Sequence, residues 1–173
     1  NSFNENGDTA LILASREGFP KMVDLLLKDD RIDPDAQDDY FDMTALSFAA
    51  VLGKIDVVRV FLKKEFKEKI NVNVRNGQDG TTALMEAING NKFKITKLLM
   101  ENPDVDVNVK DESHMTALMR IASSTYPNIE ILELLLKRTD LDFSTKDLIH
   151  KKTAEELALE YGNKDVHALI KNN

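Results

Sequence analysis

The 173-residue chain is 42% hydrophobic and 31% charged, a composition typical of a folded globular protein and unlike that of a disordered chain. It has no cysteine, which excludes disulfides, thiol nucleophiles and thiolate metal sites. The net charge of −7 comes from residues 1–42, which carry eleven acidic and four basic residues, whereas residues 43–173 carry nineteen of each. With no basic stripe, nucleic acid is not an expected partner.

A Thr-Ala-Leu motif returns along the chain at a nearly constant interval. The motif threonines, with a partial fifth copy at Thr153-Ala154, are Thr9, Thr44, Thr82, Thr116 and Thr153, spaced 35, 38, 34 and 37 residues apart. Each of the first four is followed 16 to 18 residues later by an apolar triplet such as Leu25-Leu26-Leu27. Self-similarity at a period in the thirties predicts a stack of structural repeats.

Each copy predicts two short helices. The motif threonine can cap the first helix through its hydroxyl, and in the first copy Leu11, Leu13 and Ala14 are expected to form its buried face. Nine residues after the threonine comes a residue that tolerates the left-handed backbone and ends the helix. These residues are Gly18, Gly53, Asn91 and Gly162. The apolar triplet then belongs to the second helix.

Two copies carry insertions, which in a solenoid are expected in surface loops. In the fourth copy the extra residues fall near Ser123–Pro127 and lengthen the connection between its helices. In the second copy Lys63–Lys69 extend the second helix or its exit. Between copies lie short extended segments followed by turns, such as Val72-Asn73-Val74 before Gly77–Gly80. Such a segment and turn before a threonine cap predict a hairpin-like finger between helix pairs.

This combination resembles the ankyrin repeat. The second copy shows it most completely, with Thr44–Ala50, Gly53, Asp56–Leu62 and Asn71-Val72-Asn73 standing where the family has Thr-Pro-Leu-His-x-Ala, Gly, Val-Val-x-Leu-Leu-Leu and Asp-Val-Asn. Alanine replaces the family proline in every copy, and the family histidine is absent. The resemblance implies an all-α, ankyrin-type helix-pair solenoid over residues 1–173, with repeats at about 5–38, 39–77, 78–111, 112–147 and 148–173.

The two ends of the array differ. The last copy has Glu155 and Glu156 where the others are mostly apolar, as expected of a capping repeat. The first copy has no polar replacement at Leu11, Ile12 and Leu13. We therefore expect upstream repeats or another domain to cover it. The chain begins without Met or a signal-peptide pattern, which predicts a piece of a longer cytoplasmic protein, or of one delivered into a host cell if the source is a pathogen.

No catalytic, cofactor or metal site is predicted. His114, His150 and His167 lack the second histidine or carboxylate spacing of a metal site and are expected to be exposed polar residues. The seven aspartates between Asp29 and Asp42 lack the glycine and closing glutamate of an EF-hand, so we expect them to cap turns. The segment Gly77–Thr82 lacks the Gly-Lys-Ser/Thr ending of a phosphate loop.

A partner surface is predicted at the second copy. In the ankyrin family the fingers and the exposed side of the first helices generally bind other proteins. At the variable positions of that surface every residue of the second copy is apolar or aromatic, whereas the equivalent residues elsewhere are mostly polar. The predicted partner-binding residues are Tyr40, Phe41, Met43, Phe48, Val51 and Leu52. Some of them could instead pack on a neighbouring finger or under Phe3. Asp38, Asp39 and Asp42 beside them favour a partner with a basic or amphipathic segment.

Three functional classes follow from these patterns. The first is a monomeric, non-catalytic protein-interaction module that binds neither nucleic acid nor a membrane. The second is a rigid spacer or targeting arm of a larger protein, such as a bacterial effector, whose activity lies outside this chain. The third, an enzyme, is disfavoured because no nucleophile–base pair or metal constellation is visible.

Overall fold

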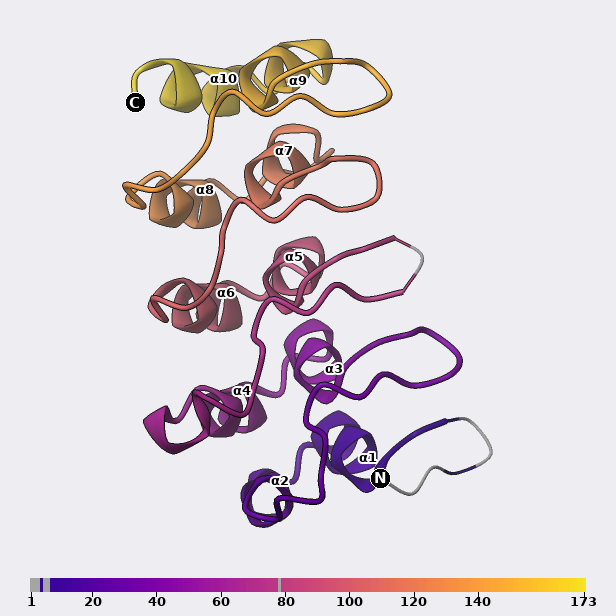
Figure 1. Ribbon diagram of the computed structural model, residues 1–173. Helices are drawn as coiled ribbons and strands as arrows, with labels where there is room; N and C mark the ends of the chain where they lie inside the picture. The colour runs from indigo at the N-terminus through magenta and orange to yellow at the C-terminus, as the bar shows by residue number, and fades with distance from the viewer. Residues whose placement is uncertain (1–3, 5–6, 78) are drawn as a thin grey trace.

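Helix pairs stacked in one direction make up the structure (Figure 1). The computed structural model describes residues 4, 7–77 and 79–173, so Phe3 and Gln78 lie outside the described residues. The α-helices of the described part are α1 (Ala10–Glu17), α2 (Pro20–Leu27), α3 (Ala45–Val51), α4 (Ile55–Phe61), α5 (Ala83–Asn89), α6 (Phe93–Met100), α7 (Ala117–Ala122), α8 (Ile129–Leu135), α9 (Ala154–Glu160) and α10 (Lys164–Lys171).

The helices form two rows. The odd-numbered helices α1 to α9 pack on one another in chain order, and the even-numbered helices α2 to α10 form a second row beside them (Figure 1). Long loops project from the side of the odd-numbered row (Figure 1). The described residues contain helices and isolated bridges but no strand. The predicted all-α helix-pair solenoid is therefore confirmed.

The motif threonines cap the first helix of every pair. The hydroxyl of each accepts a hydrogen bond from the backbone N–H three residues later, and each threonine has an extended backbone. Thr153 completes a capping box, because the Glu156 side chain accepts a hydrogen bond from the Thr153 N–H in return. Since a threonine cap contributes about 1 kcal/mol, the five caps support helices of only six to eight residues.

The predicted left-handed residues are also confirmed. Gly18, Gly53, Asn91 and Gly162 have φ angles of 85°, 78°, 51° and 74°. The fourth pair differs because its connection is longer, running from Ser123 to Asn128. There the Asn128 side chain accepts a hydrogen bond from the Ile131 N–H and caps α8. The other predicted insertion, after α4, contains the 3-10 helix η1 (Lys64–Phe66), and its Phe66 side chain is buried in the core.

The core lies between successive pairs, and it corrects the prediction for the first one. Leu11 and Ile12 are already buried in the structure, whereas a cover for the first copy from upstream repeats or another domain stays a prediction. Leu13, expected to be buried, is exposed. Successive residues of a helix are about 100° apart, so Leu13 points away from the neighbours that cover Leu11 and Ile12. The exposed apolar residues of this pair are Leu13, Phe19, Met22 and Leu25.

Candidate functional site

The projecting loops, here called fingers, share one turn geometry. The fingers that precede α3, α5, α7 and α9 comprise residues 37–44, 75–82, 110–116 and 146–153. Isolated antiparallel bridges join Gln37 to Thr44 and Asn76 to Thr81 at the bases of the first two. Two residues before every motif threonine the backbone is left-handed. The residues there are Gly7, Asp42, Gly80, His114 and Lys151, with φ between 49° and 73°. This second recurring left-handed position was not predicted from the sequence.

Buried carboxylates fix the turns of three fingers. Asp38 accepts hydrogen bonds from the N–H groups of Tyr40, Phe41 and Met43. Asp111 and Asp147 do the same in their fingers, for two and three N–H groups respectively. Burial of Asp147 favours its neutral form, but the N–H groups that bind it outweigh this and lower its pKa. The fingers are thus shaped by internal hydrogen bonds.

Among the aspartates between Asp29 and Asp42, turn capping is confirmed for Asp29, Asp33 and Asp38. Asp29 accepts a hydrogen bond from the N–H of Arg31, and Asp33 accepts one from the N–H of Asp35. Asp35 in turn accepts from the N–H of Asn71 in the next repeat. Each of these three carboxylates accepts a hydrogen bond from a backbone N–H group, so Asp29, Asp33 and Asp35 have a structural role.

Backbone hydrogen bonds join each finger to the next. The Gly77 N–H donates to the Asp42 carbonyl at 2.9 Å, and the Leu148 N–H donates to the Ser113 carbonyl at 2.9 Å. Between the middle fingers the Glu112 N–H donates to the Asp79 carbonyl at 3.0 Å. The four fingers, residues 37–44, 75–82, 110–116 and 146–153, therefore form one connected surface, which we call the finger ridge.

The predicted partner-binding residues fall into an exposed group and a buried one. Tyr40 is 78% exposed, Phe41 and Leu52 are about half exposed, and Met43 and Val51 are half-buried. Phe48 is only 5% exposed, so its predicted direct contact with a partner is corrected. We call Tyr40, Phe41, Met43, Val51 and Leu52 the apolar patch.

Ring contacts explain how Phe48 supports the apolar patch from beneath. The Phe41 ring lies edge-on to the Tyr40 ring at 4.6 Å and to the Phe48 ring at 6.2 Å between centroids. The Arg16 guanidinium lies 5.0 Å from the centroid of the Phe48 ring. Edge-to-face pairs of this kind contribute about 0.5–1.5 kcal/mol each beyond burial. Phe48 therefore holds Phe41, and through it Tyr40, in an exposed position.

The apolar patch stands out from the rest of the inner surface by register. In the first and last repeats, the residue before the motif threonine forms an ion pair with the residue seven after it: Asp8 with Arg16 at 3.0 Å and Lys152 with Glu160 at 3.1 Å. In the second repeat the corresponding residues are Met43 and Val51. Of these three repeats, only the second has an apolar pair where the other two have an ion pair.

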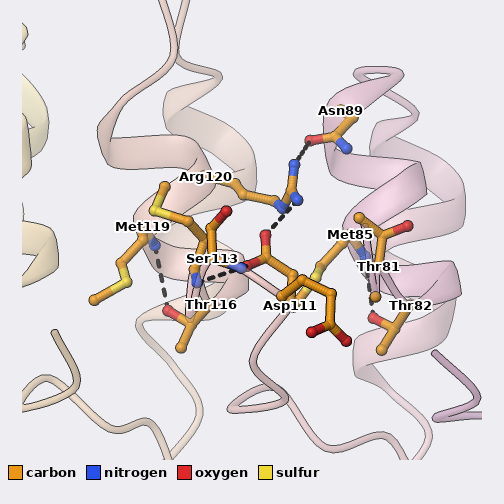
Figure 2. A network of polar contacts seen from close by, with 12 residues as sticks. Thr81, Thr82, Met85, Asn89, Asp111, Ser113, Thr116, Met119 and Arg120 are labelled. Atoms are coloured by element: carbon orange, nitrogen blue, oxygen red, sulfur yellow. Dashed lines mark hydrogen bonds and ion pairs between the residues drawn. The ribbon is translucent and has the colours of Figure 1, made fainter. Parts of the chain in front are cut away.

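The fourth repeat is polar at the position of Phe48. Arg120 occupies that register and donates hydrogen bonds to Asp111 in its own finger and to Asn89 at the end of α5 (Figure 2). Asp111 is buried, so this ion pair is partly shielded from water. The network fixes the finger to two neighbouring helices. Arg120 thus places a charged side chain where the second repeat has Phe48.

A second exposed apolar pair, Leu148 and Ile149, lies in the last finger and was missed in the sequence reading. Ile149 is 72% exposed and has the same register as Tyr40, four residues before the motif threonine. The register that selects Tyr40 in the second copy selects Ile149 in the fifth, but not Leu148, which stands five residues before the threonine where the second copy has Asp39. In the finger that precedes α7 the positions that match Leu148 and Ile149 are Asp111 and Glu112.

The described residues were compared with the side-chain clusters that metal and catalytic sites require. No cluster of three or more His, Cys, Asp or Glu among them could hold a metal ion. His150 lies 3.4 Å from Asp147, His167 lies 3.2 Å from Glu155, and His114 is exposed. No helix in the described part of the chain has the length and apolar character needed to cross a membrane. An open cavity of about 420 Å³ lies between the exits of α4 and α6, with Phe61, Ile70 and Leu98 among its lining residues.

Comparison with protein families agrees with this geometry. A family model described as ankyrin repeats in three copies matches residues 28–111 and 63–147, and one described as an ankyrin repeat matches residues 6–39. Ankyrin repeats are generally protein–protein interaction modules, and proteins built from them are typically non-catalytic. With stacked helix pairs, capped first helices and fingers at the same register, the chain belongs to the ankyrin repeat family.

Proposed function

We propose that this chain binds a partner protein through the apolar patch and the finger beside it. The observation that carries the proposal is the exposure of Tyr40, which presents most of a large aromatic side chain to solvent while Phe41 and Phe48 hold it in place. Aromatic side chains held rigid at the surface are the usual anchors of protein interfaces. Their burial by a partner removes a large apolar area from water.

Charge near the apolar patch favours a basic or amphipathic segment in the partner. Asp39 and Asp42 are exposed in the same finger as Tyr40, and that finger contains no lysine or arginine. Opposite charges around an apolar contact speed association and orient the partner more than they raise affinity. We therefore expect the association rate to fall with rising salt, while the apolar contacts determine dissociation.

The test is affinity capture with the native chain, followed by titration of the captured protein against Tyr40→Ala/Leu52→Ala. Both side chains are exposed, so the double variant should stay folded, and its free energy of unfolding should fall by no more than the about 0.5–1.5 kcal/mol of the Tyr40–Phe41 ring pair. Affinity should fall at least tenfold if they belong to a hot spot. Leu25→Ala is the matched control, because Leu25 is an exposed apolar residue on the opposite row of helices.

Two outcomes would contradict the proposal. If the captured protein binds the double variant as tightly as the native chain, the apolar patch is not its contact surface. If the chain captures no specific protein while a larger protein containing it does, the spacer or targeting-arm function is favoured instead. If Leu25→Ala also weakens binding, the contact surface includes the even-numbered row of helices.

A further inference from the structure

We propose that the ligand is an extended segment of a partner protein with two apolar anchors, one on Tyr40 and Phe41 and the other on Leu148 and Ile149. This inference rests on the proposed function and adds the length, the anchors and the charge order of the partner segment. The observation behind it is that the finger ridge carries exposed apolar side chains at its two ends and polar ones between them.

The two anchor sites occupy equivalent places on the repeat. Tyr40 and Ile149 both stand four residues before a motif threonine, and they are 78% and 72% exposed. In the finger before α7 the same position is Glu112, which is exposed and forms an ion pair with Arg75 at 2.6 Å. Equivalent positions on equal turns point the same way, so the two apolar sites face one side of the ridge.

The distance between the anchors is fixed by the finger ridge. Each finger is joined to the next by a backbone hydrogen bond, and buried Asp38 and Asp147 shape the turns of the two end fingers. Packed helices lie about 8–10 Å apart, so three repeat steps separate the anchor sites by about 25–30 Å. An extended chain advances about 3.3–3.6 Å per residue. The two anchors of the ligand should therefore be about seven to nine residues apart.

Charge gives the ligand a direction. The finger of Tyr40 exposes Asp39 and Asp42, whereas the finger of Ile149 exposes Lys146 and Lys151. The complementary segment carries a basic residue beside the anchor that binds Tyr40 and an acidic residue beside the anchor that binds Ile149. A segment with the charges exchanged meets like charges at both ends and binds more weakly.

The experiment selects ligands without assuming a partner. A phage-displayed library of random 20-residue peptides is panned on the 173-residue chain, and the recovered peptides are synthesised. Their affinities are measured by fluorescence anisotropy for the native chain, Tyr40→Ser, Ile149→Ser and the control Leu25→Ser. The substituted side chains are exposed, so Ile149→Ser and Leu25→Ser should leave thermal unfolding unchanged. Tyr40→Ser also loses the Tyr40–Phe41 ring contact, so it should stay folded with an unfolding temperature lower by only a few degrees.

The expected result has three parts. Recovered peptides carry two apolar residues at the predicted spacing, and Tyr40→Ser and Ile149→Ser each weaken binding about tenfold. Deleting three residues between the peptide's anchors also weakens binding, because the shortened segment cannot reach both sites. If the shortened peptide no longer reaches Ile149, its affinity should be the same for Ile149→Ser as for the native chain. Leu25→Ser leaves every affinity unchanged.

Other results separate this inference from the proposed function. Peptides that lose affinity with Tyr40→Ser but not with Ile149→Ser overturn the two-anchor ligand and leave the apolar patch as a binding surface. Peptides whose affinity is unchanged by both substitutions contradict the two-anchor ligand and the proposed function alike. Recovery of no peptide that binds above background contradicts an extended segment as the ligand, while capture of a folded protein that depends on Tyr40 and Leu52 would still support the proposed function.

Discussion

Replacing Lys151 with glycine should stabilise the protein. Lys151 has a φ of 56°, and its side chain is exposed. An L-residue in the left-handed region costs about 1–2 kcal/mol, whereas glycine costs little there. Glycine also gains more freedom in the unfolded chain, which offsets about 0.4–1 kcal/mol. The net expectation is a gain of about 0.5–1 kcal/mol in the free energy of unfolding.

Urea unfolding followed by circular dichroism measures this gain, and a thermal scan should show a rise of about 1–4 °C for a chain of this size. Lys146→Gly is the matched control: the same side chain is replaced in the same finger at a residue without positive φ. There glycine only adds unfolded-state freedom and should destabilise by about 0.5–1 kcal/mol. Equal destabilisation by the two substitutions would refute the assignment of strain to Lys151.

Two further predictions concern carboxylates of the fingers and the segments that lead into them. Asp111→Ala should lower the free energy of unfolding by about 2–4 kcal/mol, because it leaves Arg120 and two backbone N–H groups without their buried partner. The control is Glu112→Ala at an exposed neighbour, which should change the free energy of unfolding by less than about 0.5 kcal/mol. Equal effects of the two substitutions would contradict the stabilising role of the Asp111 network. The Ser144 and Thr145 hydroxyls lower the pKa of Asp142 to about 2. A folded pKa below the unfolded value of about 3.9 means that Asp142 contributes stability above about pH 4 and loses it as the pH falls towards 2. Asp142→Asn should therefore flatten the pH dependence of urea unfolding in that window, and an unchanged slope would show that Asp142 does not contribute.

The helix pairs could be predicted because their signals are local. A threonine hydroxyl caps the helix that follows it, and a glycine or asparagine nine residues later permits the left-handed turn that ends it. Neither depends on distant contacts. The lengthened connection in the fourth repeat was predictable for the same reason, since its spacing departs from that of the other copies.

The finger turns were only partly predictable, because different residue types adopt the same left-handed backbone conformation at one position of each repeat. Gly7 and Gly80 mark the left-handed position plainly, but Asp42, His114 and Lys151 do not. The buried aspartates and the bonds between neighbouring fingers impose the geometry there. Such tertiary constraints leave no residue-type signal for single-sequence reasoning to detect.

The exposure of a side chain in the candidate site depends on its neighbours, so it could not be predicted from the position in the repeat alone. Leu13 and Phe48 stand at the same place in their repeats, yet Leu13 is exposed and Phe48 is buried. Phe48 is covered by Arg16 from the preceding repeat and by Phe41 from its own finger. A register position states which way a side chain points, while its burial depends on what the adjacent repeat supplies.

Hydrogen–deuterium exchange of the chain with and without its captured partner tests the central claim most directly. If the partner binds the apolar patch and the finger ridge, amides in residues 38–43 and at the end of α3 should exchange more slowly in the complex. Exchange in the outer helices α2, α4 and α6 should not change. Protection confined to those outer helices, or to the cavity between the exits of α4 and α6, would contradict the assignment of the binding surface.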